Sequence, residues 1–223
     1  MNTPDDKPRI IALDGPAASG KGTLARRLAD IYDFAYLDTG VLYRGVAWLM
    51  MEQGLDPADT DAAAETARAF QLEQIDGAPV RSRAVGAAAS VVAANKDVRA
   101  ALLDYQRAFA AEPPNDAAGA ILDGRDIGTV VCPDASVKFF VTASPETRAE
   151  RRWRELKEDK PDLTLETVLA DLKERDARDA ERADAPMKAA ADAELLDTSH
   201  LAIDAVVAVA RRVIDDIFER SAD

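Results

Sequence analysis

Residues 15–23, which read GPAASGKGT, constrain the fold more than any other segment of the chain. They follow the short apolar run 10–13, and they open a helical pattern that places Leu24, Leu28 and Ile31 on one face. A strand, a glycine-rich loop and a helix in this order form the arrangement that wraps the phosphates of a nucleotide. The alternative, a glycine-rich turn with a surface lysine, does not account for the strand and the helix on either side.

The residue types in this loop suit an anion. Glycines let the backbone bend so that its N–H groups point inward, and the helix N-terminus adds a favourable positive potential. Lys21 can reach the β- and γ-phosphates, and because Gly22 follows it directly, the hydroxyl that can help hold Mg²⁺ is that of Thr23. We therefore expect nucleotide phosphates to contact this set: Gly15, Pro16, Ala17, Ala18, Ser19, Gly20, Lys21, Gly22 and Thr23.

Composition narrows the class of protein and its partners. The 223 residues suffice for one substantial α/β domain with inserts. The net charge of −13 disfavours nonspecific binding to nucleic acid or to an acidic membrane. The one cysteine, Cys132, excludes an internal disulfide, and the one histidine, His200, argues against a histidine metal site. Residues 1–8 are polar and no apolar stretch follows that could form a signal or a membrane span, so we expect a cytoplasmic protein, by default a monomer.

Strand and helix patterns alternate along the chain. Short apolar runs predict strands at 10–13, 34–37, 120–122 and 137–141, the last two with little polar interruption, and residues 194–197 fit a last strand. Helical periodicity predicts helices at about 22–32, 41–52, 84–94, 97–109, 145–157, 164–182 and 203–220. In the less regular segment 54–83 we expect a helix near residue 62 and a turn at 75–79. The alternation predicts an α/β fold, a doubly wound parallel sheet flanked by helices, whose ligands lie at the carboxyl ends of the strands.

Three carboxylates come just after predicted strands and therefore belong to that rim: Asp14, Asp38 and Asp123. Asp123 directly follows an apolar run, a position that commonly handles Mg²⁺ in phosphate-loop enzymes, often through water. The alternative is a turn aspartate that caps the next segment. Arg125 and Asp126 continue the same loop and add a cation for phosphate and a hydrogen-bond acceptor.

Arginines gather in two clusters beyond this loop. The first opens the helix predicted at 145–157 and consists of Arg148, Arg151, Arg152 and Arg154. In the second, Arg175, Asp179 and Arg182 are spaced i, i+4, i+7 and share one helical face. Either set can be a solvated face with ion pairs worth about 0.2–0.5 kcal/mol each. Beside a phosphate loop in a strongly acidic chain, we favour cations that contact the transferring phosphates.

The stretch between the two clusters, 158–162, is short and polar and offers no apolar residues that would hold the region shut. We therefore predict a mobile lid here. The first arginine cluster and Arg182 are expected to come together over the two phosphates only when both nucleotides are bound.

Together these segments resemble the bacterial cytidylate kinases, relatives of adenylate kinase among the nucleoside monophosphate kinases. The resemblance covers most of the chain. It rests on six groups of residues: Asp14-Gly15-Pro16 with Gly20-Lys21-Gly22-Thr23, Asp38-Thr39-Gly40 with Tyr43-Arg44, Ala89-Ser90 with Val98-Arg99, Gln106-Arg107-Ala108-Phe109, Asp123-Gly124-Arg125-Asp126-Ile127-Gly128-Thr129, and Lys173-Glu174-Arg175-Asp176 with Arg178-Asp179. It implies transfer of the γ-phosphate of ATP to CMP or dCMP, with Mg²⁺ required.

The resemblance also implies roles for individual residues. It assigns residues 15–23 and Arg151 to ATP, and Thr23 and Asp123 to Mg²⁺, directly or through water. It assigns CMP to Thr39, Arg44, Ser90, Arg99, Arg125, Asp126, Arg175 and Asp179. Among these, Ser90, Arg99 and Asp126 would read cytosine. It assigns catalysis to Lys21, Arg125 and Arg182.

A single kinase domain spanning 1–223 is the organisation that the resemblance implies. Its parts are a core at about 1–40, 118–150 and 190–223, a monophosphate-binding region at about 41–117, and a short lid at about 151–165. Two segments depart from the family pattern. Residues 70–83 are shorter than the usual insert that carries strands, so we expect part of that small sheet to be missing, and the loop 112–119 is longer than expected.

The base-reading set also makes chemical sense. Cytosine offers a donor at N4 and acceptors at N3 and O2, so Asp126 can accept from N4 while Arg99 donates to N3 and O2. Uracil reverses the polarity at O4 and N3, so both contacts fail together. Standing alone, Arg99 would be read as a solvent-facing helical arginine and Ser90 as a small residue packed in an alanine-rich helix.

Two rival functions use the same phosphate loop. One is another kinase of this kind that acts on AMP, UMP or a small alcohol such as shikimate. The other is a nucleotide-binding switch without transfer activity, which a guanine-reading Asn-Lys-x-Asp motif would support. Residues 95–98 only imitate that motif, because Val98 stands where the aspartate is needed.

Overall fold

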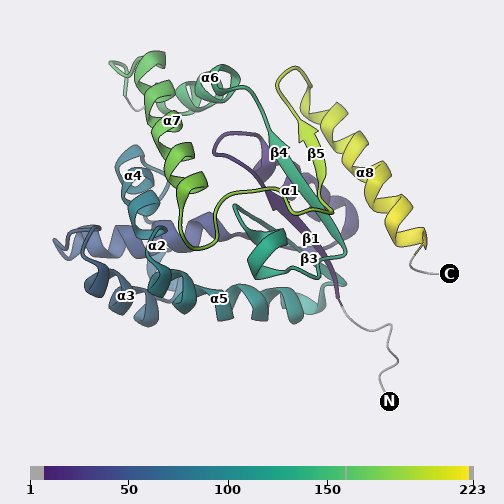
Figure 1. Ribbon diagram of the computed structural model, residues 1–223, viewed down its shortest axis with the longest axis horizontal. Helices are drawn as coiled ribbons and strands as arrows, with labels where there is room; N and C mark the ends of the chain where they lie inside the picture. The colour runs from purple at the N-terminus through teal and green to yellow at the C-terminus, as the bar shows by residue number, and fades with distance from the viewer. Residues whose placement is uncertain (1–7, 159, 221–223) are drawn as a thin grey trace.

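A five-stranded parallel sheet forms the centre of the part of the chain that the structure describes, residues 8–158 and 160–220 of a computed structural model (Figure 1). Its strands run in the order β2-β3-β1-β4-β5, and every neighbouring pair is parallel. Their bounds are β1 Arg9–Asp14, β2 Ala35–Asp38, β3 Gly119–Gly124, β4 Val137–Thr142 and β5 Glu194–Asp197. The predicted doubly wound sheet is therefore confirmed.

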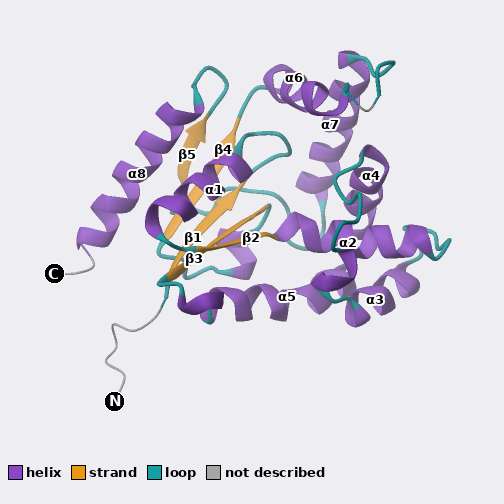
Figure 2. Ribbon diagram, turned by 180° about the vertical axis from the view of Figure 1, so that it is seen from behind, coloured by secondary structure: helices purple, strands orange, loops and turns teal. Residues whose placement is uncertain are grey.

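Alternate residues of the central strands face opposite layers of helices, because side chains alternate across a strand. Ile11 and Leu13 pack with α1 (Lys21–Tyr32) and α8 (Ile203–Arg220) on one face. Ala12 packs on the other face with α5 (Lys96–Ala111). In Figure 2, α1 lies in front of the sheet and α8 runs beside β5. Both faces are covered, which is why these strands read as apolar runs without polar alternation.

A second group of helices lies beyond one end of the sheet (Figure 1). It consists of α2 (Thr39–Glu52), α3 (Thr60–Ala69), α4 (Arg83–Val92) and the first part of α5. These helices share their own buried cluster, which includes Leu42, Val46, Met50, Val92 and Leu102. The 70–83 segment contains a 3₁₀ helix, Leu72–Ile75, and no strand, in agreement with the expectation drawn from its short length. A further 3₁₀ helix, Pro114–Asp116, lies in the loop before β3.

The two arginine-bearing helices, α6 (Pro145–Leu156) and α7 (Leu165–Glu181), pack against each other through Ala149, Val168 and Leu172. The connector between them is not as free of apolar contacts as its sequence suggested. Trp153 and Leu163 pack against this cluster, and the Trp153 Nε1–H donates to the Leu163 carbonyl at 2.7 Å. Leu163 lies one residue beyond the polar run on which the prediction rested. The residue that packs against it, Trp153, lies in α6, before the connector begins. Asp159, in the predicted lid, lies outside the described residues.

The structure departs from the sequence prediction at one helix boundary and in one element that was not predicted. Helix α2 begins at Thr39 rather than near 41, because Asp38 is its N-cap residue and the Thr39 hydroxyl donates to the Asp123 carbonyl at 2.8 Å. A short π-helix, Ile127–Val131, follows β3 and was not predicted. Among the described residues, no helix is long and apolar enough to cross a membrane.

Candidate active site

The glycine-rich loop joins β1 to α1 at the carboxyl end of the sheet, and its glycines are required by geometry. Gly15 has φ +140°, and a Cβ there would lie 2.0 Å from the Val141 carbonyl oxygen. Gly20 has φ +91° and is the N-cap residue of α1. The loop is therefore fixed in its bent form by the neighbouring strand β4.

Lys21 is buried at the start of α1, and its ammonium group donates to the Pro16 carbonyl at 3.2 Å. Its side chain thus folds back over its own loop. Burial and, after it, the nearby Arg125 lower the pKa of Lys21 to about 7, against the opposing effect of Asp123 and Asp38. Because burial disfavours the charged form of Lys21, an anion bound beside the ammonium group would stabilise that form strongly.

Two further buried cations, Arg44 and Arg175, also have lowered pKa values. Burial, together with neighbouring guanidinium groups, lowers the pKa of Arg44 to about 10 and that of Arg175 to about 9. Arg125 contributes to the shift at both residues and at Lys21. In a chain of net charge −13, these cations converge on one place, which a polyanion such as a pair of phosphate chains would neutralise.

Asp123 is the penultimate residue of β3 and lies beside the phosphate loop. The hydroxyl that contacts its carboxylate was not predicted from the sequence. Tyr36 on β2 donates to Asp123 Oδ2 at 2.9 Å. A Cβ at Gly22 would lie 3.1 Å from the same oxygen, whereas Thr23 is exposed on the first turn of α1. Burial raises the pKa of Asp123, and Asp38 adds to this, against the effect of Lys21. In the register of β2 beside β3, Tyr36 pairs with Ile121 and Asp38 with Asp123. Tyr36 therefore lies on the same side of the sheet as Asp123, two residues from it, and this register could have indicated the contact.

Asp179 on α7 gathers three of the predicted arginines. Its side chain is fully buried, pairs with Arg125 Nε at 3.0 Å, and also pairs with Arg182. Arg175 Nε lies 3.8 Å away. Burial alone would raise the pKa of Asp179, but the three guanidinium groups outweigh it and the pKa is lowered. The predicted common face of these residues is therefore confirmed, with Asp179 at its centre.

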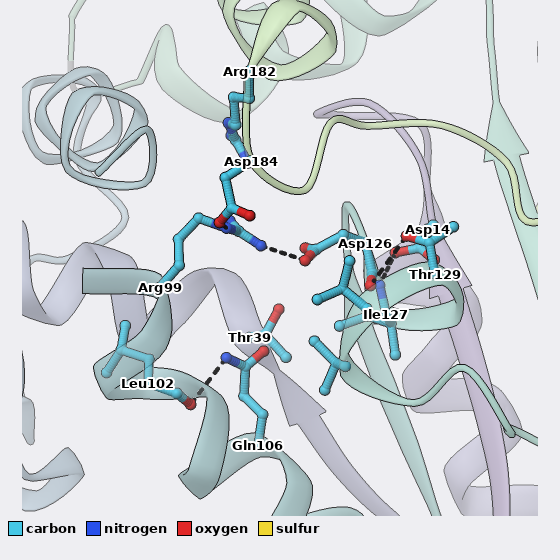
Figure 3. A network of polar contacts seen from close by, with 12 residues as sticks. Asp14, Thr39, Arg99, Leu102, Gln106, Asp126, Ile127, Thr129, Arg182 and Asp184 are labelled. Atoms are coloured by element: carbon cyan, nitrogen blue, oxygen red, sulfur yellow. Dashed lines mark hydrogen bonds and ion pairs between the residues drawn. The ribbon is translucent and has the colours of Figure 1, made fainter. Parts of the chain in front are cut away.

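Arg99 on α5 and Asp126 after β3 form a buried ion pair (Figure 3). Asp184, from the segment after α7, lies on the other side of the same guanidinium group at 3.5 Å. Ser90 on α4 is also buried, and its hydroxyl oxygen has no hydrogen-bond partner. Neither Arg99 nor Ser90 faces solvent, so the alternative of a solvent-facing arginine at 99 is wrong.

A cavity of about 550 Å³ lies between α4, α6 and α7. Three of the predicted acceptor residues, Arg44, Ser90 and Arg175, line it. The lining does not include Arg99 or Asp126, which pair with each other, or Arg125 and Asp179. The structure thus places all the predicted acceptor residues but Thr39 in one cavity or in two ion-pair networks, and the Thr39 hydroxyl donates to the Asp123 carbonyl instead.

The first arginine cluster divides into different roles. Arg148 is buried and holds the structure together, because it donates to the carbonyls of Ala143 at 3.0 Å and Ala17 at 3.3 Å and pairs with Asp176 at 2.6 Å. The prediction that Arg148 contacts phosphates is therefore not supported. Arg154 is exposed and pairs with a glutamate one turn away, as in the solvated-face alternative.

The other two arginines of this cluster also border the candidate site. Arg151 donates to the Ser19 carbonyl at 3.3 Å and to the Thr198 carbonyl at 2.7 Å, beside the phosphate loop. Arg152 donates to the Arg81 carbonyl at 3.1 Å and lines the cavity.

One ion pair joins α4 to α7 at the edge of this cavity. Arg83 contacts Asp171 through two hydrogen bonds, Nε at 2.6 Å and Nη2 at 2.9 Å.

Arg83→Ala should make the amides of 165–175 exchange faster, with an unfolding free energy lowered by less than about 1 kcal/mol because the pair is solvent-accessible. Hydrogen exchange and a denaturant titration check this. Arg27→Ala, which removes the Arg27–Asp204 pair on α1 and α8, is the matched control and should leave 165–175 unchanged. Unchanged exchange in Arg83→Ala would show that this pair does not hold α7.

A family model described as cytidylate kinase matches residues 11–216. A protein of that name from Rhodopseudomonas palustris is 53% identical over 93% of this chain and 96% of its own, and one from Rhodospirillum rubrum is 55% identical over 92% and 96%. A third, from Caulobacter vibrioides, is 52% identical over 93% and 95%. Among solved structures, an uncharacterized protein from Eubacterium ventriosum aligns with a TM-score of 0.54 at 14% identity, over 93% of this chain and 98% of that one, which supports the fold alone.

Proposed function

The chain belongs to the cytidylate kinase family and is a phosphotransferase, and we propose that it transfers the γ-phosphate of ATP to CMP or dCMP, which gives ADP and CDP or dCDP. The observation that carries the proposal is the convergence of Lys21, Arg125, Arg44 and Arg175 between the glycine-rich loop and the cavity. A kinase needs positive charge where its donor and acceptor phosphates meet.

On the donor side, we assign the phosphates of ATP to the backbone of residues 15–23. The bent loop and the start of α1 supply inward N–H groups, and the Ser19 hydroxyl is buried there without a hydrogen-bond partner. Arg151 lies against this loop through the Ser19 carbonyl and is assigned to ATP with it.

On the acceptor side, we assign the phosphate of CMP to Thr39, Arg44 and Arg125, of which Arg44 lines the cavity and Arg125 lies close enough to Lys21 to lower its pKa. We assign the sugar of CMP to Arg175 and Asp179, and contact with the phosphates to Arg182. The base falls to Ser90, Arg99 and Asp126. The unpartnered Ser90 hydroxyl and the cavity beside it support this direction for the nucleotide.

The site also fits Mg²⁺, which prefers oxygen ligands and keeps several waters. Asp123 and Asp38 end adjacent strands beside Lys21 and can hold the ion directly or through water. Thr23, exposed on the first turn of α1, remains our second assignment. When bound, Mg²⁺ neutralises charge on the β- and γ-phosphates.

The protein's own part in the reaction is positioning and charge neutralisation, so no side-chain nucleophile is needed. The acceptor phosphate attacks the γ-phosphate in line. Lys21 and Arg125 lie between the two phosphate sites and can stabilise the charge that develops on the transferred group. Arg182 is held by Asp179 close to Arg125 and is assigned the same task.

We also propose the organisation that the resemblance implied: a core, a monophosphate-binding region at about 41–117 and a short lid at about 151–165. The separate buried cluster of α2–α5 and the packing of α6 on α7 support this division. We expect a monomer that works in the cytoplasm and binds small-molecule substrates, with neither nucleic acid nor membrane as a partner.

A coupled assay tests the proposed substrates. With ATP and Mg²⁺, ADP formation should be fastest with CMP and dCMP and far slower with UMP, AMP, GMP or shikimate. A preference for AMP or for a small alcohol would contradict the proposal. Binding of nucleotide without turnover would favour the switch that the phosphate loop alone permits.

Tyr36→Phe should weaken the use of Mg²⁺. Loss of the hydroxyl that holds Asp123 removes about 0.5–1.5 kcal/mol of hydrogen bonding. We expect the Mg²⁺ concentration for half-maximal rate to rise about 2- to 10-fold, measured by Mg²⁺ titration of the assay. Tyr32→Phe is the matched control, because the Tyr32 hydroxyl also donates to an aspartate, Asp215 on α8, which has no assigned part in Mg²⁺ binding. An equal effect in both variants would show that Tyr36 acts only through general stability.

A further inference from the structure

Asp14, the last residue of β1, carries a buried carboxylate to which the proposed function gives no role. It immediately precedes the phosphate loop and pairs in register with Gly124 of β3 and Phe140 of β4. Its side chain does not point into the phosphate loop. It points toward the segment that follows Asp126 (Figure 3).

Both oxygens of Asp14 accept hydrogen bonds from successive backbone amides. Oδ1 accepts from Ile127 N at 2.7 Å and Oδ2 from Gly128 N at 2.8 Å. These are the first two residues of the π-helix Ile127–Val131. The first N–H groups of a helix have no partner within it, so Asp14 supplies the cap of this helix from another strand.

This cap changes what Asp126 is free to do. Asp126 is the N-cap residue of the π-helix, and an aspartate there ordinarily caps the helix with its own side chain. Here the Asp126 side chain makes no cap hydrogen bond, and it pairs instead with Arg99 on α5. An N-cap side chain ordinarily accepts from the second or third amide of its helix, and the Asp14 carboxylate occupies the first two, including that of Gly128, which Asp126 could otherwise take.

The cost of the arrangement supports a specific role. Burial raises the pKa of Asp14 to about 6, and the two amide hydrogen bonds oppose that shift. A Cβ at Gly128 would lie 3.4 Å from Asp14 Oδ2, which is ordinary van der Waals contact, and 3.1 Å from Lys138 Cδ. The two amide hydrogen bonds therefore only partly offset the cost of burying this carboxylate.

We propose that Asp14 is a positioning residue for base recognition: by capping the π-helix from β1, it releases the Asp126 carboxylate to pair with Arg99 and with the base of the acceptor. The proposal rests on the proposed function, in which Asp126 reads cytosine. It also ties the strand that carries the donor loop to the segment that reads the acceptor.

Asp14→Asn tests this with little change in shape. The amide oxygen can accept one bond, but its NH₂ group faces the other backbone N–H, so Asp126 is expected to turn toward the freed amide. We expect the ratio of kcat/KM for CMP to that for UMP to fall about 5-fold or more, with the KM for ATP changed less than about 2-fold. Asp192→Asn is the matched control, since Asp192 pairs with Lys138 beside Gly128 and does not cap the helix. It should leave the ratio unchanged.

A double-mutant cycle separates this proposal from the proposed function. In the Asp126→Asn background, Asp14→Asn should cost no further base preference, because the carboxylate that it positions is gone. A further loss there, or an equal loss on CMP and UMP in Asp14→Asn alone, would overturn the positioning role. If Asp126→Asn by itself left the preference intact, the base-reading assignment would fall. An intact preference in Asp14→Asn beside a lost one in Asp126→Asn would overturn the role of Asp14 alone.

A measurement on the unaltered chain covers the case in which Asp14→Asn does not fold. The amides of Ile127 and Gly128 should exchange with solvent at least 100-fold more slowly than exposed amides of similar sequence, because a buried carboxylate holds them. Exchange at the rate of exposed amides would overturn the proposal.

Discussion

Lys21→Ala is expected to lower kcat about 10²–10³-fold while the chain stays folded. Lys21 is buried between the glycine-rich loop and Arg125, where charge develops on the transferred phosphate. The turnover number with saturating ATP and CMP checks the prediction. Arg27→Ala, which removes a cation from the exposed face of the same helix, should keep turnover near that of the unaltered chain. Near-normal turnover in Lys21→Ala would refute the role of the lysine.

The same variant carries a prediction about stability with a definite sign. The pKa of Lys21 is about 7 in the folded chain, well below the value of about 10.4 for an unfolded lysine. The folded state therefore binds fewer protons here than the unfolded state, and at neutral pH this residue costs stability. Lys21→Ala should consequently leave the melting temperature at pH 7 unchanged or raise it. A clear fall would mean that lost activity reflects damage to the fold.

The sheet could be predicted from the sequence because its central strands are covered on both faces. Runs such as 120–122 are apolar without alternation, and the runs 10–13, 34–37 and 120–122 each end just before a carboxylate at the same rim. The grouping of Arg175, Asp179 and Arg182 was also predictable, since helical spacing alone puts them on one face. These features depend on residues close in sequence.

Features that depend on contacts between distant segments could not be predicted in this way. The π-helix at 127–131 is capped by a carboxylate 113 residues away, so its own sequence carries no cap signal. Tyr36 on β2 donates to Asp123 on the neighbouring strand β3, and Arg148 on α6 pairs with Asp176 on α7. The polar run 158–162 indicated no apolar contact, because the contact is made by Leu163, one residue beyond the run, with Trp153 on the preceding helix. In each case the missing information is the tertiary partner.

Asp126→Asn is the second large effect and concerns the choice of base. If Asp126 accepts from cytosine N4 and Arg99 donates to N3 and O2, an amide at 126 can instead donate to uracil O4. A contact of this quality discriminates by about 1–3 kcal/mol, so the preference for CMP over UMP should fall about 5- to 150-fold. Asp184→Asn removes the other carboxylate beside Arg99, which is exposed and lies 3.5 Å from the guanidinium group. It should change the preference far less.

The most direct test of this account is the ratio of kcat/KM for CMP to that for UMP, measured at fixed ATP and Mg²⁺ for the unaltered chain, Asp126→Asn and Asp184→Asn. The account predicts a strong preference for CMP that Asp126→Asn erodes and Asp184→Asn keeps, with the KM for ATP nearly the same in all three. If Asp126→Asn instead lowered activity on CMP and UMP by the same factor, Asp126 would belong to the phosphate or metal machinery, and the assignment of base reading to the Arg99–Asp126 pair would be wrong.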